Sequence, residues 1–256
     1  MFCGQLEALY LGDYESGLKL EREVLQIWEP ITGRLFPLLR IVQILTAQGI
    51  YADALATLDI ARPLGDKVVM DIGRAGLAMV TIILANTLND EPRLWEALEL
   101  VHQIQQMTTD NVVSQQYRMA VACEASDTHL KLAHHLLEKD KHEYWKQLTQ
   151  ALESSQNAVD LYQHFGFVQI VECTSEEILY RHGQALAANG RSEESNEFLE
   201  RAYKEMMRKH DLIPVHSPFR KTFLTKIQLH VDIQNLYTSK SSPKPRRRKK
   251  SNPSVQ

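Results

Sequence analysis

Residues 182–202 read HGQALAANGRSEESNEFLERA, in which the corner glycine Gly190 is followed by Ser195 five positions on and Ala202 twelve positions on. The same spacing recurs twice nearer the N-terminus, as Gly12/Gly17/Val24 and Gly49/Ala54/Ala61. Glycine turns the chain without a Cβ penalty, and small residues beyond it let the second helix of a hairpin lie close to the first. Such a unit cannot bury its apolar face alone. The pattern therefore predicts stacked helical hairpins, whose usual work is binding other macromolecules.

Apolar residues recur at helical spacing along the rest of the chain, and no segment alternates as a strand would. This predicts an all-α fold of about five helical hairpins, with a last amphipathic helix capping the stack. Thr174 or Ser175 should cap the helix of the fifth hairpin, with Glu177 and Thr174 forming a capping box, and Trp145 should lie on a buried face. The expected helices cover residues 2–11, 14–28, 35–47, 51–62, 67–88, 93–107, 112–137, 142–165, 174–188, 192–210 and 219–237.

Composition agrees with a chain that buries a sizeable core, because 44% of the 256 residues are hydrophobic. Its cysteines, Cys3, Cys123 and Cys173, are three in number and far apart, which disfavours a disulfide framework and a zinc knuckle. The opening residues show no secretory signal. The most apolar stretch has only 15 uncharged residues, from Ala75 to Asn89, against the roughly 20 that a membrane helix needs. We therefore expect a cytoplasmic protein without a membrane partner.

Three motifs resemble tetratricopeptide repeats: GDYESG at 12–17, AQGIYADAL at 47–55 and the stretch at 182–202. In such repeats the second helix starts just after Gly-x-Tyr, which Tyr14 and Tyr51 match and Ser192 does not. Glu21 also departs from the pattern, at a usually apolar position. The resemblance implies a right-handed superhelical solenoid over residues 1–237. The spacing supports the period at Gly12 to Gly49, 37 residues, and weakens in the middle of the chain.

A narrower likeness covers about a quarter of the chain, from Glu172 to Leu236. This region, which begins ECTSEEILYRHGQ, looks like the C-terminal repeats of large bacterial regulators that join a signalling ATPase to a repeat array. The likeness implies a detached or truncated sensor arm. A phosphate-binding loop of the form G-x-x-x-x-G-K-[ST] does not occur in the sequence, so we expect no nucleotide hydrolysis.

Other chemistry finds little support in the residue pattern. The histidines at 129, 134, 135 and 142 cluster in sequence, but they form no His-Glu-x-x-His motif. No serine or cysteine lies in a Gly-x-Ser-x-Gly elbow. The acid pairs Glu176-Glu177 and Glu193-Glu194 fall in first helical turns, where they suit the helix dipole. We therefore expect no enzyme activity, no catalytic residue, no metal and no cofactor.

A binding face is suggested by an alignment on the corner glycines. Arg40 and Gln43 precede Gly49 by nine and six residues, and Arg181 and Gln184 precede Gly190 by the same intervals. In tetratricopeptide repeats the glutamine position usually faces the groove, and an arginine beside it could bind a peptide carboxylate. We therefore expect these four residues to belong to a groove that binds a protein or peptide. The alternative is that the arginines pair with acids between repeats.

The C-terminal segment differs in charge from the body. Residues 238–256 hold seven lysines and arginines and no acid, whereas the rest of the chain carries a net charge of about −10. This composition predicts a disordered tail. Its cluster Arg246, Arg247, Arg248, Lys249 and Lys250 could contact nucleic acid nonspecifically through phosphates, serve as a eukaryotic localisation signal, tether an acidic surface, or be a solvated extension.

Two functions follow from these observations. The first is a non-enzymatic scaffold that binds a protein or peptide in its groove, within a signalling or transcription system. The second is a nucleic-acid-associated regulator whose tail holds DNA or RNA. Salt-dependent binding by the tail-deleted protein would discriminate between them.

Overall fold

The computed structural model describes residues 3–27, 31–65, 67, 71–106, 112–170 and 173–241. These residues are almost entirely helical, and the described ranges contain no β-strand, although one isolated bridge joins Ile170 and Cys173. The fold is therefore all-α, as predicted. The elements are α1 (Cys3–Gln5), a π-helical turn (Leu6–Tyr10), α2 (Tyr14–Ile27), α3 (Ile31–Ala47), α4 (Tyr51–Gly65), α5 (Asp71–Leu88), α6 (Glu91–Gln105), α7 (Val112–Leu136), α8 (Lys141–His164), α9 (Ser175–Ala188), α10 (Ser192–Leu212), α11 (Phe219–Thr225) and α12 (Gln228–Ser241).

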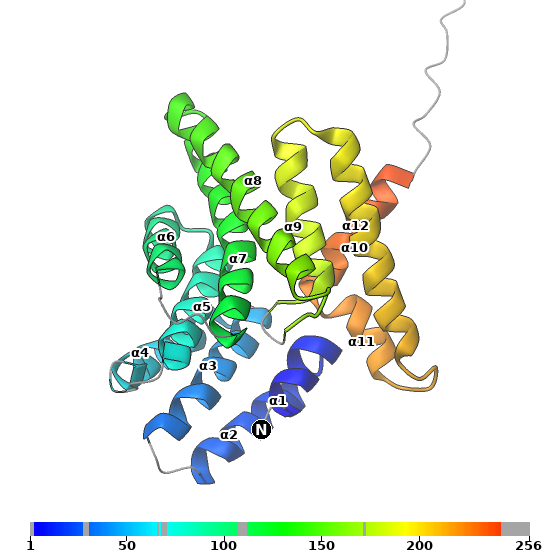
Figure 1. Cartoon of the computed structure of the whole chain (residues 1–256). Coiled ribbons are helices and arrows are strands. Elements are labelled where there is room, and N and C mark those ends of the chain that lie inside the picture. Colours follow the sequence, from blue (N-terminus) through cyan, green and yellow to red (C-terminus); the bar gives the residue numbers. More distant parts are fainter. Residues whose placement is uncertain are drawn as a thin grey trace, which may run out of the picture.

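The helices form successive hairpins arranged in two layers. Helices α3, α5, α7 and α9 contact one another in that order and make the inner layer, while α4, α6, α8 and α10 pair with them on the outside. In Figure 1 the hairpins run around the molecule from α1 and α2 in blue to α9 and α10 in yellow. The orange α11 then returns to the N-terminal end.

Three hairpin corners depend on glycine. Gly12, Gly49 and Gly190 have φ values of 75°, 77° and 78°, a left-handed conformation that other residues adopt only with strain. Asn89 takes the same conformation, with a φ of 51°, at the corner between α5 and α6. The repeated glycine in the sequence therefore marks a repeated backbone conformation.

The small residues after the corners lie where helices touch. Ala54 is fully buried, and the Ser195 hydroxyl donates a 2.8 Å hydrogen bond to the carbonyl of Gly183 in the preceding helix. A Cβ on Gly17 would lie 2.6 Å from the Cβ of Ala8. Close contact within each hairpin thus follows from the side-chain size that the sequence pattern specifies.

Several expected helix limits were wrong. Helix α3 begins at Ile31 and includes Pro37, and α4 continues through Pro63 to Gly65. A proline within a helix costs about 3 kcal/mol, but Leu35, Leu38 and Leu39 beside Pro37 are buried in the core, and burying each such side chain contributes about 1.5–3 kcal/mol. The free energy gained by burying these leucines therefore outweighs the cost of the proline.

The last expected helix, 219–237, is in fact two helices, α11 and α12. The chain turns at Lys226 and Ile227, which allows Phe223, Ile227 and Ile233 to pack together with α10 residues in one apolar cluster. A straight helix would leave part of this apolar set in solvent. Helix α12 also continues to Ser241, past the boundary expected at 237, while tail residues 242–256, including Arg246–Lys250, lie outside the described residues.

The core consists of apolar clusters that run along the inner layer and into the outer one. The largest joins α5, α6, α7 and α8 to Cys173 and Ile178. The expectation for Trp145 was wrong, because its side chain is 61% exposed on the outer helix α8. None of the described helices is long and apolar enough to cross a bilayer.

Candidate functional site

The inner layer borders a partly open cavity of about 830 Å³. Its walls come from α3, α5, α7 and α9, from the N-terminal residues around Tyr10 and Tyr14, and from α11 and α12. The volume lies within the 300–1,000 Å³ typical of ligand pockets. Elements from both ends of the described chain therefore meet around one hollow.

Three of the four predicted groove residues line this cavity: Gln43, Arg181 and Gln184. Arg40 is not among the residues that line it. Its guanidinium is buried and lies 3.5 Å from the Glu21 carboxylate, whose side chain is only 1% exposed. Burial raises the pKa of Glu21, while Arg40 opposes the shift. The buried carboxyl group of Glu21 is thus accommodated by an arginine from the next helix.

The lining residues are held by hydrogen bonds from neighbouring helices. Gln43 accepts a 3.2 Å bond from the side chain of Gln5. Arg181 donates to the carboxylate of Asp127 at 2.9 Å and to Gln184 at 3.3 Å. Asp127 also accepts a bond from Lys131 at 2.5 Å. The alternative expectation, that arginines pair with acids of adjacent repeats, therefore describes both Arg40 and Arg181.

Two carboxylates in the cavity wall, Glu124 of α7 and Glu177 of α9, were not identified from the sequence. Glu124 accepts a 2.7 Å bond from the amide of Asn86, and Asn86 in turn accepts a 2.8 Å bond from Thr128. The capping box was correctly predicted: the Glu177 amide donates to the Thr174 hydroxyl at 3.3 Å, and the Glu177 side chain interacts with the Thr174 backbone. Glu177 was noticed only for this role in the helix terminus.

The two carboxylates resist ionisation together. Burial and, after it, the charge of Glu124 raise the pKa of Glu177 to about 8, while Arg181 opposes the shift. Burial also raises the pKa of Glu124. Because the two groups influence each other, they titrate as a pair that retains a proton near neutral pH.

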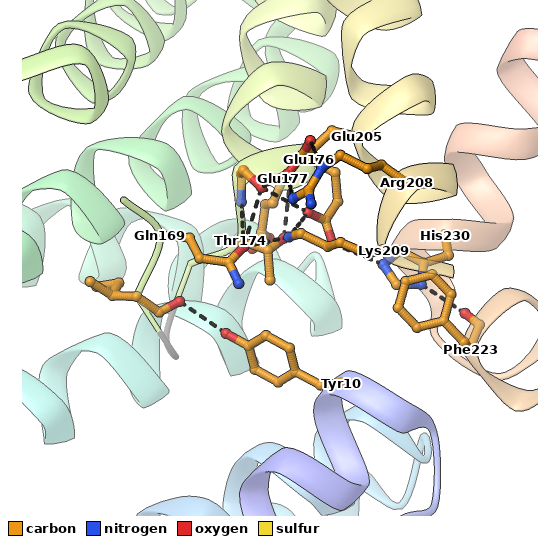
Figure 2. A network of polar contacts seen from close by, with 12 residues as sticks. Tyr10, Gln169, Thr174, Glu176, Glu177, Glu205, Arg208, Lys209, Phe223 and His230 are labelled. Carbon is orange, nitrogen blue, oxygen red and sulfur yellow. Dashed lines mark hydrogen bonds and ion pairs between the residues drawn. The ribbon is translucent and has the colours of Figure 1, made fainter. Parts of the chain in front are cut away.

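The neighbouring Glu176 behaves in the opposite way. Figure 2 shows its carboxylate between the Lys209 ammonium and the His230 ring, and the distance from His230 Nε2 to Glu176 Oε1 is 3.2 Å. Although burial opposes ionisation, the bonds from His230 and Lys209 lower the pKa of Glu176 to about 2. Glu176 and Glu177 both line the cavity, but Glu176 is a compensated anion that ties α9 to α10 and α12.

Four tyrosines give the cavity an aromatic lining: Tyr10, Tyr14, Tyr51 and Tyr180. Two of them are the repeat aromatics at Gly-x-Tyr, Tyr14 and Tyr51. The hydroxyl of Tyr10 donates to the carbonyl of Ile170 at 2.9 Å (Figure 2), and that of Tyr14 donates to the carbonyl of Lys226 at 2.9 Å. The bonds hold these two aromatic rings in position.

Other reactive residues lie in different surroundings. Ser155 is 2.9 Å from His182, but both are buried, and burial lowers the pKa of His182 to about 4. Cys123 and Cys173 are buried free thiols, as expected of core residues, and their mutual hydrogen bond together with burial raises the pKa of Cys173. Within the described residues, no three His, Cys, Asp or Glu side chains come together as a metal site.

Comparisons with family models, curated proteins and solved structures return no match for the chain. The tetratricopeptide resemblance and the narrower likeness to regulator repeats therefore remain predictions.

Proposed function

We propose that the chain is a non-enzymatic, tetratricopeptide-type binding module that holds a short peptide segment of a partner protein in its central cavity. The observation that carries the proposal is the cavity itself, which is lined by side chains from every inner helix. In stacked helical hairpins the inner layer forms a continuous concave surface, and such surfaces serve as binding sites. The proposal includes the superhelical repeat architecture over residues 1–237 and a role as the sensor arm of a signalling ATPase or transcription regulator.

The character of the lining supports binding rather than catalysis. The cavity combines fixed tyrosine rings with amides and charged groups placed on rigid helices, as ligand pockets commonly do. Its acids and bases are largely engaged with one another, as in the contacts of Asp127 with Arg181 and Lys131. The pairing of a serine with a histidine, at Ser155 and His182, is buried away from the cavity lining.

The test uses a displayed library of random seven-residue peptides, followed by calorimetric titration of synthetic hits. Ala47 lines the cavity and is exposed, so Ala47→Trp places a large side chain in it. Ala56→Trp is the matched control, because Ala56 is exposed on α4 and lies outside the lining. We expect peptides whose affinity falls at least about tenfold in Ala47→Trp and is unchanged in Ala56→Trp. Equal binding by both variants, or a library without hits, would overturn the proposal.

A further inference from the structure

The charges around the cavity are unevenly compensated. Of the cations that line it, Lys131 and Arg181 both bond to Asp127. Glu176 is bonded to Lys209 and His230. Glu124 and Glu177 have no ion-pair partner within 4.0 Å among the described residues. The cavity therefore holds two neighbouring carboxylates whose charge the surrounding side chains do not match by direct contact.

The polar network beside these carboxylates is also incomplete. The Nε of Arg181 is buried and has no hydrogen-bond acceptor in the described part of the chain. An unsatisfied buried polar atom costs about 1–3 kcal/mol, and native sites that retain one commonly complete the network with a ligand or water. Arg181 lines the cavity, so the wall that holds Glu124 and Glu177 also offers an N–H donor, which a carbonyl of a bound peptide can satisfy and an ammonium cannot.

We propose that the cavity receives the cationic group of a primary amine, such as a lysine side chain of the bound peptide, at the carboxylates of Glu177 and Glu124. The inference rests on the proposed function of the cavity and names the chemistry of its ligand. The ammonium donates hydrogen bonds to the two carboxylates, and the tyrosine rings of the lining accommodate its aliphatic stem and attract its charge.

In the empty cavity a proton takes the place of the ligand cation. Burial and the charge of Glu124 raise the pKa of Glu177 to about 8, so the pair carries a proton at pH 7. When the ammonium binds, this proton leaves to solvent and both carboxylates are ionised. Binding of the amine is therefore an exchange of one cation for another, and it is coupled to pH.

Other titratable groups that face Glu177 and Glu124 do not reverse this coupling. On α7 and α9 these groups are Cys123, Asp127, Lys131, Glu176, Tyr180 and Arg181. Glu176 stays ionised because its pKa is lowered to about 2. The pKa of Arg181 is raised by its acidic neighbours against the effect of burial, so it stays charged. Further away are Cys173, Lys209, His230, Asp232, Tyr10 and Tyr14, of which Lys209 and His230 contact Glu176.

The experiment compares three tripeptide amides by ligand-observed NMR up to millimolar concentration. The first is acetylated with a central lysine, the second is acetylated with a central norleucine, and the third has norleucine and a free N-terminus. We expect the lysine peptide to bind at least about tenfold more tightly than the acetylated norleucine peptide. The free N-terminus has a pKa of about 8, so its affinity should stay nearly the same from pH 7 to pH 9, whereas that of the lysine peptide should rise about tenfold. This arm separates a side-chain amine from a backbone amine.

Two variants assign the effect to the carboxylate. Glu177→Gln removes the charge but keeps the capping box, which accepts glutamine as well as glutamate. Glu193→Gln is the matched control, an exposed glutamate in the first turn of α10. We expect Glu177→Gln to abolish the preference for lysine over norleucine, with an unchanged circular dichroism spectrum, and Glu193→Gln to retain it.

Proton release gives an independent readout. Calorimetry of the lysine peptide at pH 7 in two buffers of different ionisation enthalpy should show release of up to about one proton, and affinity should weaken about tenfold per pH unit below pH 8. Equal affinity of the lysine and norleucine peptides, or no binding by either, would overturn the inference. If library peptides still bind without regard to charge and Ala47→Trp blocks them, the proposed function stands and only the amine assignment fails.

Discussion

Glu177 combines two roles that act differently on stability. Its interaction with Thr174 caps α9, which favours folding by about 0.5–2 kcal/mol. Burial and the charge of Glu124 raise its pKa to about 8, which disfavours folding wherever the unfolded chain would ionise it. Ionisable residues whose charged form is unfavourable in the folded state and that line a cavity occur commonly at binding or catalytic sites.

We expect Glu177→Gln to stabilise the protein at neutral and alkaline pH. The pKa of Glu177 is raised in the folded state from 4.5 to about 8, so its contribution to stability is fully present below pH 4.5 and is lost as pH rises through 8. The variant should therefore match the wild type near pH 4.5 and exceed it by about 2–4 kcal/mol at pH 8. Urea unfolding at a series of pH values measures the difference. A constant difference across this range would contradict the raised pKa.

At this scale the sequence located part of the site. Alignment on Gly49 and Gly190 found Gln43, Arg181 and Gln184, because hairpins that turn at equivalent glycines place equivalent positions on the inner face. Arg40 lies outside the cavity lining, beside the buried Glu21 of another helix. The alignment missed Glu124, because nothing local distinguishes this acid from a solvated one until α5 and α9 enclose it.

At the scale of the helical hairpins, the corner glycines and the small residues that follow them are required for different reasons. Gly49 needs a positive φ of 77°, but a Cβ there would meet only the Tyr51 ring, at 3.8 Å or more. Gly17 is in an ordinary helix, yet a Cβ on it would lie 2.6 Å from Ala8. The first requirement is one of backbone conformation and the second is one of space.

We expect the two glycines to respond differently to substitution. Gly49→Ala should cost about 1–2 kcal/mol, because an L-residue is strained in the left-handed region, and Gly49→Asn should cost less, because asparagine tolerates that region. For Gly17, alanine and asparagine should both be poorly tolerated, with the larger side chain worse. Urea unfolding of the four variants measures the order. Equal costs for Gly49→Ala and Gly49→Asn would show that backbone strain is not the cause.

The number and order of the hairpins could be predicted from the sequence, because each helix carries its own apolar periodicity. Their limits were less predictable where tertiary packing opposes local preference. Pro37 and Pro63 both lie within helices because the surrounding leucines and alanines are buried. The turn between α11 and α12 likewise reflects packing against α10, which a continuous amphipathic pattern does not reveal.

For the whole molecule, the meeting of the two ends was beyond sequence analysis. The Thr222 hydroxyl donates to the carbonyl of Leu11 at 2.5 Å, across 211 residues. A stack of hairpins has no local feature that sets its total curvature, because small rotations accumulate from each repeat to the next. The cavity could thus be anticipated as a concave face, but not as a hollow that α11 and α12 help to enclose.

The uneven distribution of charge leads to a prediction for the second candidate function. The seven basic residues of 238–256 oppose a body with a net charge of about −10. If the tail holds nucleic acid, affinity for a DNA duplex should fall steeply between 50 and 200 mM salt, by up to about 10³-fold for six contacts, and deletion of residues 242–256 should abolish it. Fluorescence anisotropy measures both effects. Salt-insensitive binding, or equal binding by the deleted protein, would exclude this mechanism.

The contact between the two ends of the described chain should control access to the cavity. Thr222 bonds to Leu11, and Tyr14 bonds to the Lys226 carbonyl at 2.9 Å. The cavity lining includes Tyr14 as well as Ile227. Because the contact rests on few hydrogen bonds, each worth about 1 kcal/mol, we expect this part of the cavity wall to separate most easily.

We therefore expect the double variant Thr222→Val and Tyr14→Phe to loosen this contact without unfolding the inner layer. Stability should fall by about 1–3 kcal/mol, and amide hydrogen exchange should accelerate in α2 and α11 while α7 keeps its protection. The matched control is Thr57→Val with Tyr144→Phe, since Thr57 bonds to the Asp53 carbonyl within α4 and Tyr144 lies outside the cavity lining. Peptides that enter the cavity should also associate faster with the double variant, because the contact lies in the cavity wall and its loosening should widen the opening. Uniform acceleration of exchange in all helices would mean instead that the ends stabilise the whole fold and do not act as a gate.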